Sequence, residues 1–181
     1  MTTETPIKSA RVFFALWPDA EERAALAAWQ PQLQDLCGGR AMRAETIHAT
    51  LVFVGEVAQH RLEALKLAAQ EVQGQPFGLI FDVAHYWGHN HIVHAAPQTV
   101  PPQLTQLVHD LKQGLIKHRF HFDKHPGFKP HVTLLRHAKW TDAPLPGMQK
   151  VKWRARNFAL VQSARDEQGA SYQVLESFTL R

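Results

Sequence analysis

The sequence predicts an internally duplicated α+β fold with one His-x-Thr strand in each half. Two observations predict it. The pattern His-x-Thr-Leu occurs twice, at 48–51 and 131–134, and each copy has apolar neighbours suited to a buried strand. Expected strands and helices alternate around each copy, which is typical of one copy per half of a duplicated chain.

The composition fits one compact domain over residues 1–181. The chain is 45% apolar, and its net charge of +4 suits an anionic ligand without the basic runs of a strong nucleic-acid binder. Cys37 is the only cysteine, which excludes an intramolecular disulfide. The polar segment 1–9 lacks the apolar core of a secretion signal, and no apolar run approaches the roughly 20 residues that cross a bilayer. We expect a monomeric cytoplasmic protein with no membrane contact.

Apolar runs and helical periodicity predict the elements of the first half. Asp19 and Glu22 have the spacing of a capping box and start a helix that Pro31 interrupts. Gly55 is expected to end the strand of the first motif. In order, the expected elements are a strand at 11–17, a helix from about 20 to the glycine pair at 38–39, the first motif strand at about 46–54, and a helix at about 59–72.

The second half follows a similar alternation. In order, the expected elements are a strand at 77–87, a turn at 88–90, a strand at 91–96, an amphipathic helix from 101–102 to about 117, a polar and basic loop at 118–130, the second motif strand at 131–136, a linker with Pro144, Pro146 and Gly147, and closing strands at 153–163 and 171–180. The total is about seven strands and three helices.

The motifs carry the residues for acid–base chemistry. Side chains alternate along a strand, so His48 and Thr50 share one face, as do His131 and Thr133. A neutral imidazole accepts a proton from water while a protonated imidazole donates one to a leaving oxygen. Threonine hydroxyls donate to phosphate oxygens. Two such strands facing each other would suit cleavage of a phosphodiester without a metal or other cofactor.

Four segments carry a longer resemblance to a known family. They are RVFFALWPD at 11–19, HATLVFVGEV at 48–57, KPHVTLLRHA at 129–138 and LVQSARDEQGASYQVLESFTL at 160–180. In this order and spacing they resemble the 2H phosphoesterases, and within them the bacterial and archaeal RNA 2′,3′-cyclic phosphodiesterases, also called 2′-5′ RNA ligases. The resemblance spans nearly the whole chain. It implies a two-lobed fold in which two antiparallel sheets form a central groove and helices pack outside.

The resemblance implies hydrolysis of RNA ends or nucleotides bearing a 2′,3′-cyclic phosphate to 2′-phosphomonoesters. It makes His48 the proton donor to the leaving 3′ oxygen and His131 the proton acceptor that activates water. It also makes Thr50, Thr133 and Arg136 phosphate ligands. Arg136 lies five positions after His131, on the opposite face of a regular strand, so it reaches the site only if the strand bends or ends first.

Other residues are candidates for binding the rest of the substrate. Phe13 or Phe14 on the first strand and Phe128 before the second motif are candidates for stacking on a base. Four cations flank the motifs and are candidates for guiding phosphates, although most surface cations are simply solvated: Arg40, Arg43, Lys124 and Lys129.

Three alternatives stay open. The cellular role is 2′-5′ joining of RNA ends if the same groups run the reaction in reverse. A non-catalytic RNA- or nucleotide-binding module would keep the groove, although intact His and Thr in both motifs argue against it. Histidine clusters at 89–94 and 118–125 superficially resemble zinc sites, but His94 has the wrong strand parity and no cysteine accompanies it, so we expect no metal. No motif supports an ATP-dependent ligase.

Overall fold

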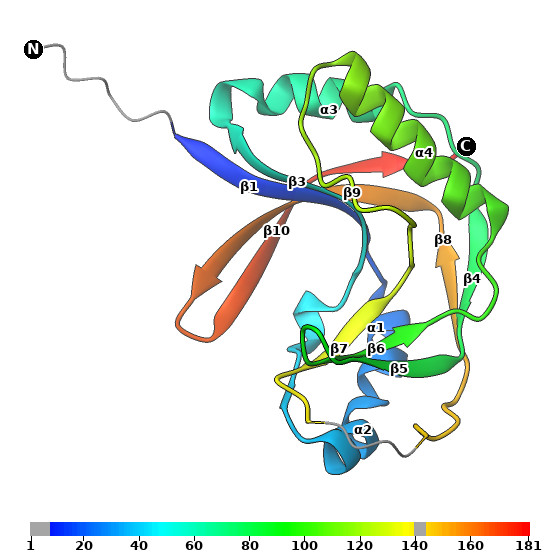
Figure 1. Cartoon of the computed structure of the whole chain (residues 1–181). Coiled ribbons are helices and arrows are strands. Elements are labelled where there is room, and N and C mark those ends of the chain that lie inside the picture. Colours follow the sequence, from blue (N-terminus) through cyan, green and yellow to red (C-terminus); the bar gives the residue numbers. More distant parts are fainter. Residues whose placement is uncertain (1–7, 140–143) are drawn as a thin grey trace, which may run out of the picture.

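The computed structural model describes residues 8–139 and 144–181. The first seven residues, which belong to the polar N-terminal segment considered above, and residues 140–143 lie outside the described part. The described residues form ten strands in three sheets, and the strand pairings are antiparallel (Figure 1). The α+β class and the two antiparallel sheets are confirmed, whereas the third sheet was not predicted.

Each of the two larger sheets receives one motif. The first sheet contains, in spatial order, β10 (Gly169–Thr179), β9 (Asn157–Asp166), β1 (Ser9–Leu16) and β3 (Ala49–Ala58). The second contains β2 (Arg40–Ala41), β7 (Val132–Arg136), β6 (Ile92–Ala96) and β5 (Val83–Trp87). The third contains β4 (Phe77–Phe81) and β8 (Val151–Ala155). His48 directly precedes β3 and His131 directly precedes β7, so the duplicated pattern places one imidazole at the start of a strand in each sheet.

Helices pack outside the sheets, as predicted. They are α1 (Ala20–Ala27), α2 (Gln30–Cys37), α3 (Leu62–Gln70) and α4 (Pro102–Lys117), with short 3-10 turns η1 (Ala44–Thr46) and η2 (Gln59–Arg61). In Figure 1, α3 and α4 lie over the first sheet and α2 lies beside the second, while α1 packs against β8 of the third. The expected apolar stripe of α4 is buried in the main core: Leu104, Leu107, Val108, Leu111 and Leu115. Within the described residues, each helix is too short or too polar to span a bilayer.

The first helix begins as its sequence predicts. The backbone N–H of Glu22 donates to the Asp19 carboxylate at 2.8 Å, and the backbone N–H of Asp19 donates to the Glu22 carboxylate at 2.9 Å. This capping box satisfies N–H groups that the first helical turn leaves without partners. Pro31 lies in the first turn of α2, where a missing N–H costs nothing. The predicted interrupted helix is therefore two helices.

Two predicted strands are each divided between sheets. The 77–87 run breaks at Asp82 into β4 and β5, and the 153–163 run breaks at Arg156 into β8 and β9. Asp82 fixes the first break, because its carboxylate accepts from the backbone N–H of Gln98 at 2.9 Å. Both runs have strand composition on either side of the break, so periodicity alone gave no sign of a change of sheet.

Gly55 does not end the first motif strand. It adopts a φ of +91°, a conformation that a side chain disfavours, and β3 continues to Ala58. The register of β3 against β1 shifts beside it, because Val12 pairs with Gly55 and Phe13 pairs with Phe53. The glycine therefore marks a bulge inside the strand instead of its end.

Gly39 holds the chain close to the strand of the second motif, and this predicts a specific destabilisation. Its φ is +84°, and an added Cβ would lie 2.6 Å from the Arg136 carbonyl oxygen. We expect Gly39→Ala to lower the free energy of unfolding by about 1–3 kcal/mol, measured by chemical denaturation. Gly78→Ala is the matched control, because an added Cβ there meets no atom within 4 Å. Equal stability of the two variants would contradict this reading.

Candidate active site

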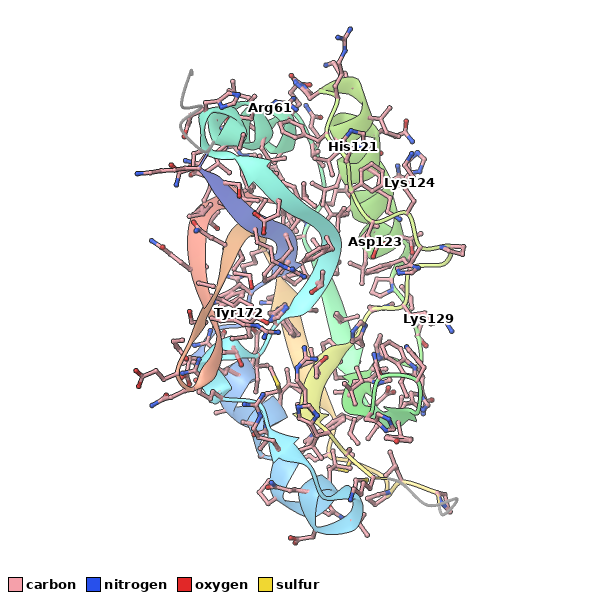
Figure 2. All side chains as sticks on the ribbon, turned by 60° about the vertical axis from the view of Figure 1, so that its left-hand side comes forward. Arg61, His121, Asp123, Lys124, Lys129 and Tyr172 are labelled. Carbon is pink, nitrogen blue, oxygen red and sulfur yellow. The ribbon has the colours of Figure 1, made fainter. Side chains whose placement is uncertain are left out.

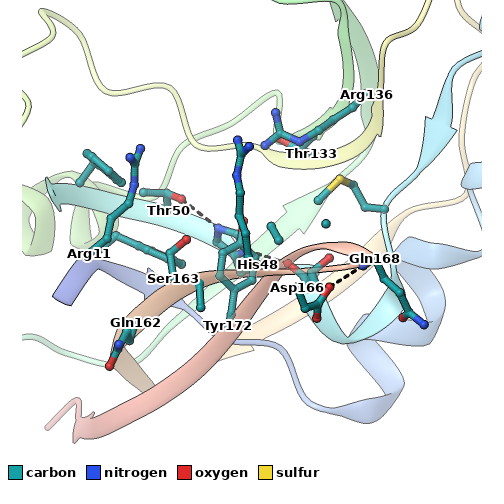
Figure 3. Close-up of a pocket in the computed structure, with 18 of the residues that line it drawn as sticks. Arg11, His48, Thr50, Thr133, Arg136, Gln162, Ser163, Asp166, Gln168 and Tyr172 are labelled. Atoms are coloured by element: carbon teal, nitrogen blue, oxygen red, sulfur yellow. Dashed lines mark hydrogen bonds between the residues drawn. The ribbon is translucent and has the colours of Figure 1, made fainter. Parts of the chain in front are cut away.

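A groove of about 1230 Å³ lies between the two larger sheets. Both motifs line it: His48 and Thr50 from the first sheet, and His131, Thr133 and Arg136 from the second. Figure 3 shows Thr133 and Arg136 across the groove from the His48–Thr50 pair. The end of the β9–β10 hairpin borders the same space. The structure thus brings together six of the eight residues that the sequence nominated, because Phe13 also lines the groove, and they come from positions far apart in the chain.

The His48 ring is oriented by two hydrogen bonds. Its Nδ1 lies 2.7 Å from the backbone oxygen of Thr46, and its Nε2 lies 3.1 Å from the Thr50 hydroxyl oxygen. A carbonyl oxygen only accepts, so Nδ1 carries the proton and donates. In the neutral ring, Nε2 then holds the lone pair and accepts from Thr50. The predicted shared face of His48 and Thr50 is therefore present.

The His131 ring repeats the first of these two hydrogen bonds. Its Nδ1 donates to the backbone oxygen of Lys129 at 2.8 Å, which again leaves the lone pair of the neutral ring on Nε2. In both motifs the accepting carbonyl belongs to the residue two positions before the histidine. Leu51 and Leu134 are buried on the opposite face, as strand alternation requires.

Arg136 reaches the groove because its strand ends there. It is the last residue of β7, and the next residue, His137, adopts a φ of +56°. Its side chain is exposed and lines the groove, and its charge lowers the pKa of His48. The parity problem that the sequence raised is thus resolved by strand termination.

The chain is similar in sequence to a known family of phosphoesterases. The LigT like Phosphoesterase family model matches residues 16–94, which include the first motif. The RNA 2′,3′-cyclic phosphodiesterase of Escherichia coli (strain K12) is 33% identical over 138 residues, which are 76% of this chain and 78% of that protein. The chain belongs to the LigT-like phosphoesterase family.

Further relatives extend the match over nearly the full chain. The RNA 2′,3′-cyclic phosphodiesterase of Archaeoglobus fulgidus is 27% identical over 180 residues, which are 93% of this chain and 99% of that protein. The crystal structure of E. coli LigT complexed with 3′-AMP has a TM-score of 0.84 and 28% identity, covering 96% of this chain and 99% of that one. The family that the sequence resembled is confirmed, and so is its fold.

The aromatic candidates occupy three different environments in this LigT-like phosphoesterase. Phe13 lines the groove with its ring centroid 4.9 Å from that of His48, but only 3% of it is exposed. Phe14 is fully buried against Phe158, because successive strand residues face opposite sides, so it does not line the groove. Phe128 packs partly buried against the core and is absent from the groove lining. Phe13 therefore packs against the His48 ring and offers little exposed surface on which a nucleobase could stack.

Sequence reasoning missed two aromatic residues around His48. The Trp17 ring stacks on the imidazole at 5.6 Å and 16°, and the Tyr172 ring meets it edge-on at 5.0 Å and 80°. Trp17 directly follows β1, and Tyr172 belongs to β10 at the other end of the chain. Both residues lie inside segments that carried the family resemblance, but nothing in the sequence pairs either of them with His48.

The flanking cations also divide. Arg43 donates to the side chain of Gln168 at 3.0 Å and pairs with Asp166 at 3.4 Å. It therefore links the β9–β10 hairpin to the segment between β2 and η1. Arg40 lines the groove. Lys124 and Lys129 lie on the exposed loop before the second motif and do not line the groove. In Figure 2 they are at the right of the molecule, whereas Tyr172 is at the left.

Burial keeps both motif imidazoles neutral in the free protein at pH 7. The pKa of His48 is lowered to about 4, chiefly by desolvation, while the hydrogen bond to Thr46 opposes the shift and the charges of His131 and Arg136 add to it. Desolvation also lowers the pKa of His131, and the Lys129 carbonyl partly offsets it. Either ring gains a proton more easily when an anion enters the groove.

His94 is a third imidazole, beneath the second motif. It is 2% exposed, pairs across the sheet with Thr133, and has its ring centroid 3.9 Å from Trp87 and 5.4 Å from His131. Burial, followed by the charges of His131 and His85, lowers its pKa to about 3. Within residues 8–139 and 144–181, no three metal-ligating side chains gather in metal-binding geometry. The zinc alternative gains no support from His94.

The buried His94 predicts how stability depends on pH. Its folded pKa of about 3 lies below the ordinary value of 6.5, so the unfolded chain binds the proton first. Its contribution is fully present above pH 6.5 and is lost as the pH falls, at up to about 1.4 kcal/mol per pH unit. His48 and His131 act in the same direction. We expect His94→Gln to flatten the fall in unfolding free energy between pH 6.5 and 5.

Chemical denaturation at several pH values measures this slope. His60→Gln, at an exposed position in η2, is the matched control. The same change of slope in both variants, or none in His94→Gln, would show that burial of His94 is not its cause.

Proposed function

We propose that this LigT-like phosphoesterase is an RNA 2′,3′-cyclic phosphodiesterase, which hydrolyses RNA ends or nucleotides bearing a 2′,3′-cyclic phosphate to 2′-phosphomonoesters without a metal or other cofactor. The observation that carries the proposal is the pair of imidazoles in one groove, each with Nδ1 held by a carbonyl and Nε2 left for chemistry. The names of the relatives from E. coli and A. fulgidus support the same activity.

The phosphate is placed between the two sheets. Thr50 and Thr133 donate hydroxyl hydrogen bonds to its non-bridging oxygens from opposite walls, and Arg136 adds a fixed positive charge. These groups stabilise the charge that develops on the phosphate oxygens as water attacks phosphorus. Thr50 releases His48 Nε2 when it turns to the phosphate, so that nitrogen becomes available to the leaving oxygen.

Two proton transfers complete the reaction. His131 Nε2 removes a proton from the attacking water while the new P–O bond forms. His48, protonated on Nε2, gives its proton to the 3′ oxygen as the P–O3′ bond breaks, which leaves a 2′-phosphomonoester. The carbonyls of Thr46 and Lys129 accept from Nδ1 throughout and stabilise each ring while it is charged. The assignment of donor and acceptor follows the family resemblance.

The groove draws on both halves of the chain, so we also propose that residues 1–181 work as one domain. The monomeric state and the cytoplasmic location stay predictions.

Loss of either imidazole tests the mechanism. We expect His48→Ala and His131→Ala each to lower kcat on adenosine 2′,3′-cyclic phosphate by roughly 10²-fold or more, the scale of a lost general acid or base. His109→Ala, an exposed position on α4, is the control and is expected to keep full activity. The assay is run in chelator with the product identified by chromatography as the 2′- or 3′-monophosphate. Full turnover in either motif variant, or a 3′ product, would refute the mechanism.

The lowered pKa values predict two different pH profiles. The profile of kcat/KM reports the free enzyme, whereas that of kcat reports the substrate complex. The bound phosphate is negative and favours imidazolium, which raises the pKa of both histidines. We therefore expect two bell-shaped curves, with the kcat optimum at higher pH than the kcat/KM optimum. Steady-state rates from pH 4 to 9 measure both, and coincident optima would contradict the electrostatic argument.

A further inference from the structure

The groove continues beyond the reacting groups along the first sheet. Arg11, Phe53 and Ser163 line this extension, and none of them has a part in the mechanism above. Arg11 pairs with Ser163 across β1 and β9, so their side chains share the face that looks into the groove. Figure 3 shows Arg11 and Ser163 close together near the Thr50 end of the site.

The Arg11 guanidinium is held in place and keeps its charge available. It lies over the Phe53 ring, 4.9 Å from the centroid. Stacking of this kind leaves the guanidinium N–H groups free at its edge. Among the described residues, Arg11 forms no ion pair with a carboxylate, and the neighbouring Glu56 accepts from the Ser9 hydroxyl at 2.7 Å. An exposed, oriented cation therefore faces the groove.

The strand register gives the spacing of this cation from the reaction centre. Thr50 is paired with Ala15 of β1, and Phe53 is paired with Phe13. The two pairs are two residues apart along β1, which corresponds to about 7 Å at the usual rise of a strand. This is close to the separation of successive phosphates along an RNA strand. A phosphate on Thr50 thus has its neighbour at the level of Phe53, under the Arg11 guanidinium.

We propose that Arg11, positioned by Phe53 and assisted by the Ser163 hydroxyl, binds the phosphate on the 5′ side of the terminal nucleoside. The preferred substrate is then the 3′ end of an RNA chain, or a nucleotide that also carries a 5′-phosphate, and not a nucleoside 2′,3′-cyclic phosphate alone. This inference rests on the proposed function, because it needs the cyclic phosphate at the two histidines. It adds a second phosphate subsite, which the mechanism does not require.

The test compares two substrates that differ only on the 5′ side. They are adenosine 2′,3′-cyclic phosphate and the dinucleotide adenylyl-adenosine ending in a 2′,3′-cyclic phosphate. We expect the full chain to prefer the dinucleotide in kcat/KM by about tenfold or more, as one charge-assisted contact provides. Arg11→Gln is expected to remove most of this preference while leaving kcat/KM on the mononucleotide unchanged. Its unchanged mononucleotide activity also shows that the variant is folded.

Two comparisons separate a local contact from a general charge effect. Arg154→Gln removes the same charge from an exposed position on β8 outside the groove and is expected to keep the preference. In a plot of log kcat/KM against log salt concentration, the slope for the dinucleotide is expected to be steeper by about 1, the contribution of one phosphate contact. Arg11→Gln is expected to equalise the two slopes.

The outcomes distinguish the inference from the function beneath it. Equal kcat/KM on both substrates in the full chain, or a preference that Arg11→Gln retains, would overturn the subsite while leaving the proposed function intact. Loss of mononucleotide activity in Arg11→Gln would also overturn it, since Arg11 would then serve the reaction centre or the fold. No hydrolysis of either substrate by the unaltered chain would reject the proposed function itself.

Discussion

The structure depends on one repeated hydrogen bond, from the Nδ1 of each motif histidine to the backbone carbonyl two residues earlier. Thr46 and Lys129 supply these carbonyls immediately before β3 and β7 begin. The bond fixes the tautomer, so that Nε2 of each ring is the atom left for chemistry. It also supports the ring when it becomes charged. The two sheets then need only to bring the starts of β3 and β7, where the two histidines lie, to the same groove.

Burial of the His48 ring and the charge of a bound anion have opposite effects on its pKa. Trp17, Phe13 and Tyr172 surround His48, and the desolvation they impose lowers the pKa of the imidazole to about 4. An anionic substrate has the opposite electrostatic effect, so the ring is charged chiefly when such a substrate is bound. The surrounding aromatic residues hold the His48 ring still, which favours a fixed geometry for proton transfer. Arg11 lies outside this enclosure, at an exposed position on β1 where the cation is hydrated.

Local sequence rules predicted much of the fold because they depend on neighbours in the chain. The capping box of Asp19 and Glu22, the apolar stripe of α4 and the shared face of His48 and Thr50 all involve residues within a few positions of each other. The same rules failed at Asp82 and Arg156, where a segment of strand composition passes from one sheet to another. They failed also at Gly55, which forms a bulge where an end was expected.

By itself, the sequence determined the two histidine–threonine pairs, their strand parity, the family resemblance and the α+β class, since each of these is written in local spacing or in whole segments. Only the tertiary structure decided that Arg136 enters the groove, that Phe14 belongs to the core, and that Tyr172 closes over His48. Those facts depend on where strands end and which sheets meet. Burial and long-range charge, which set the imidazole pKa values, arise only once distant segments have packed together.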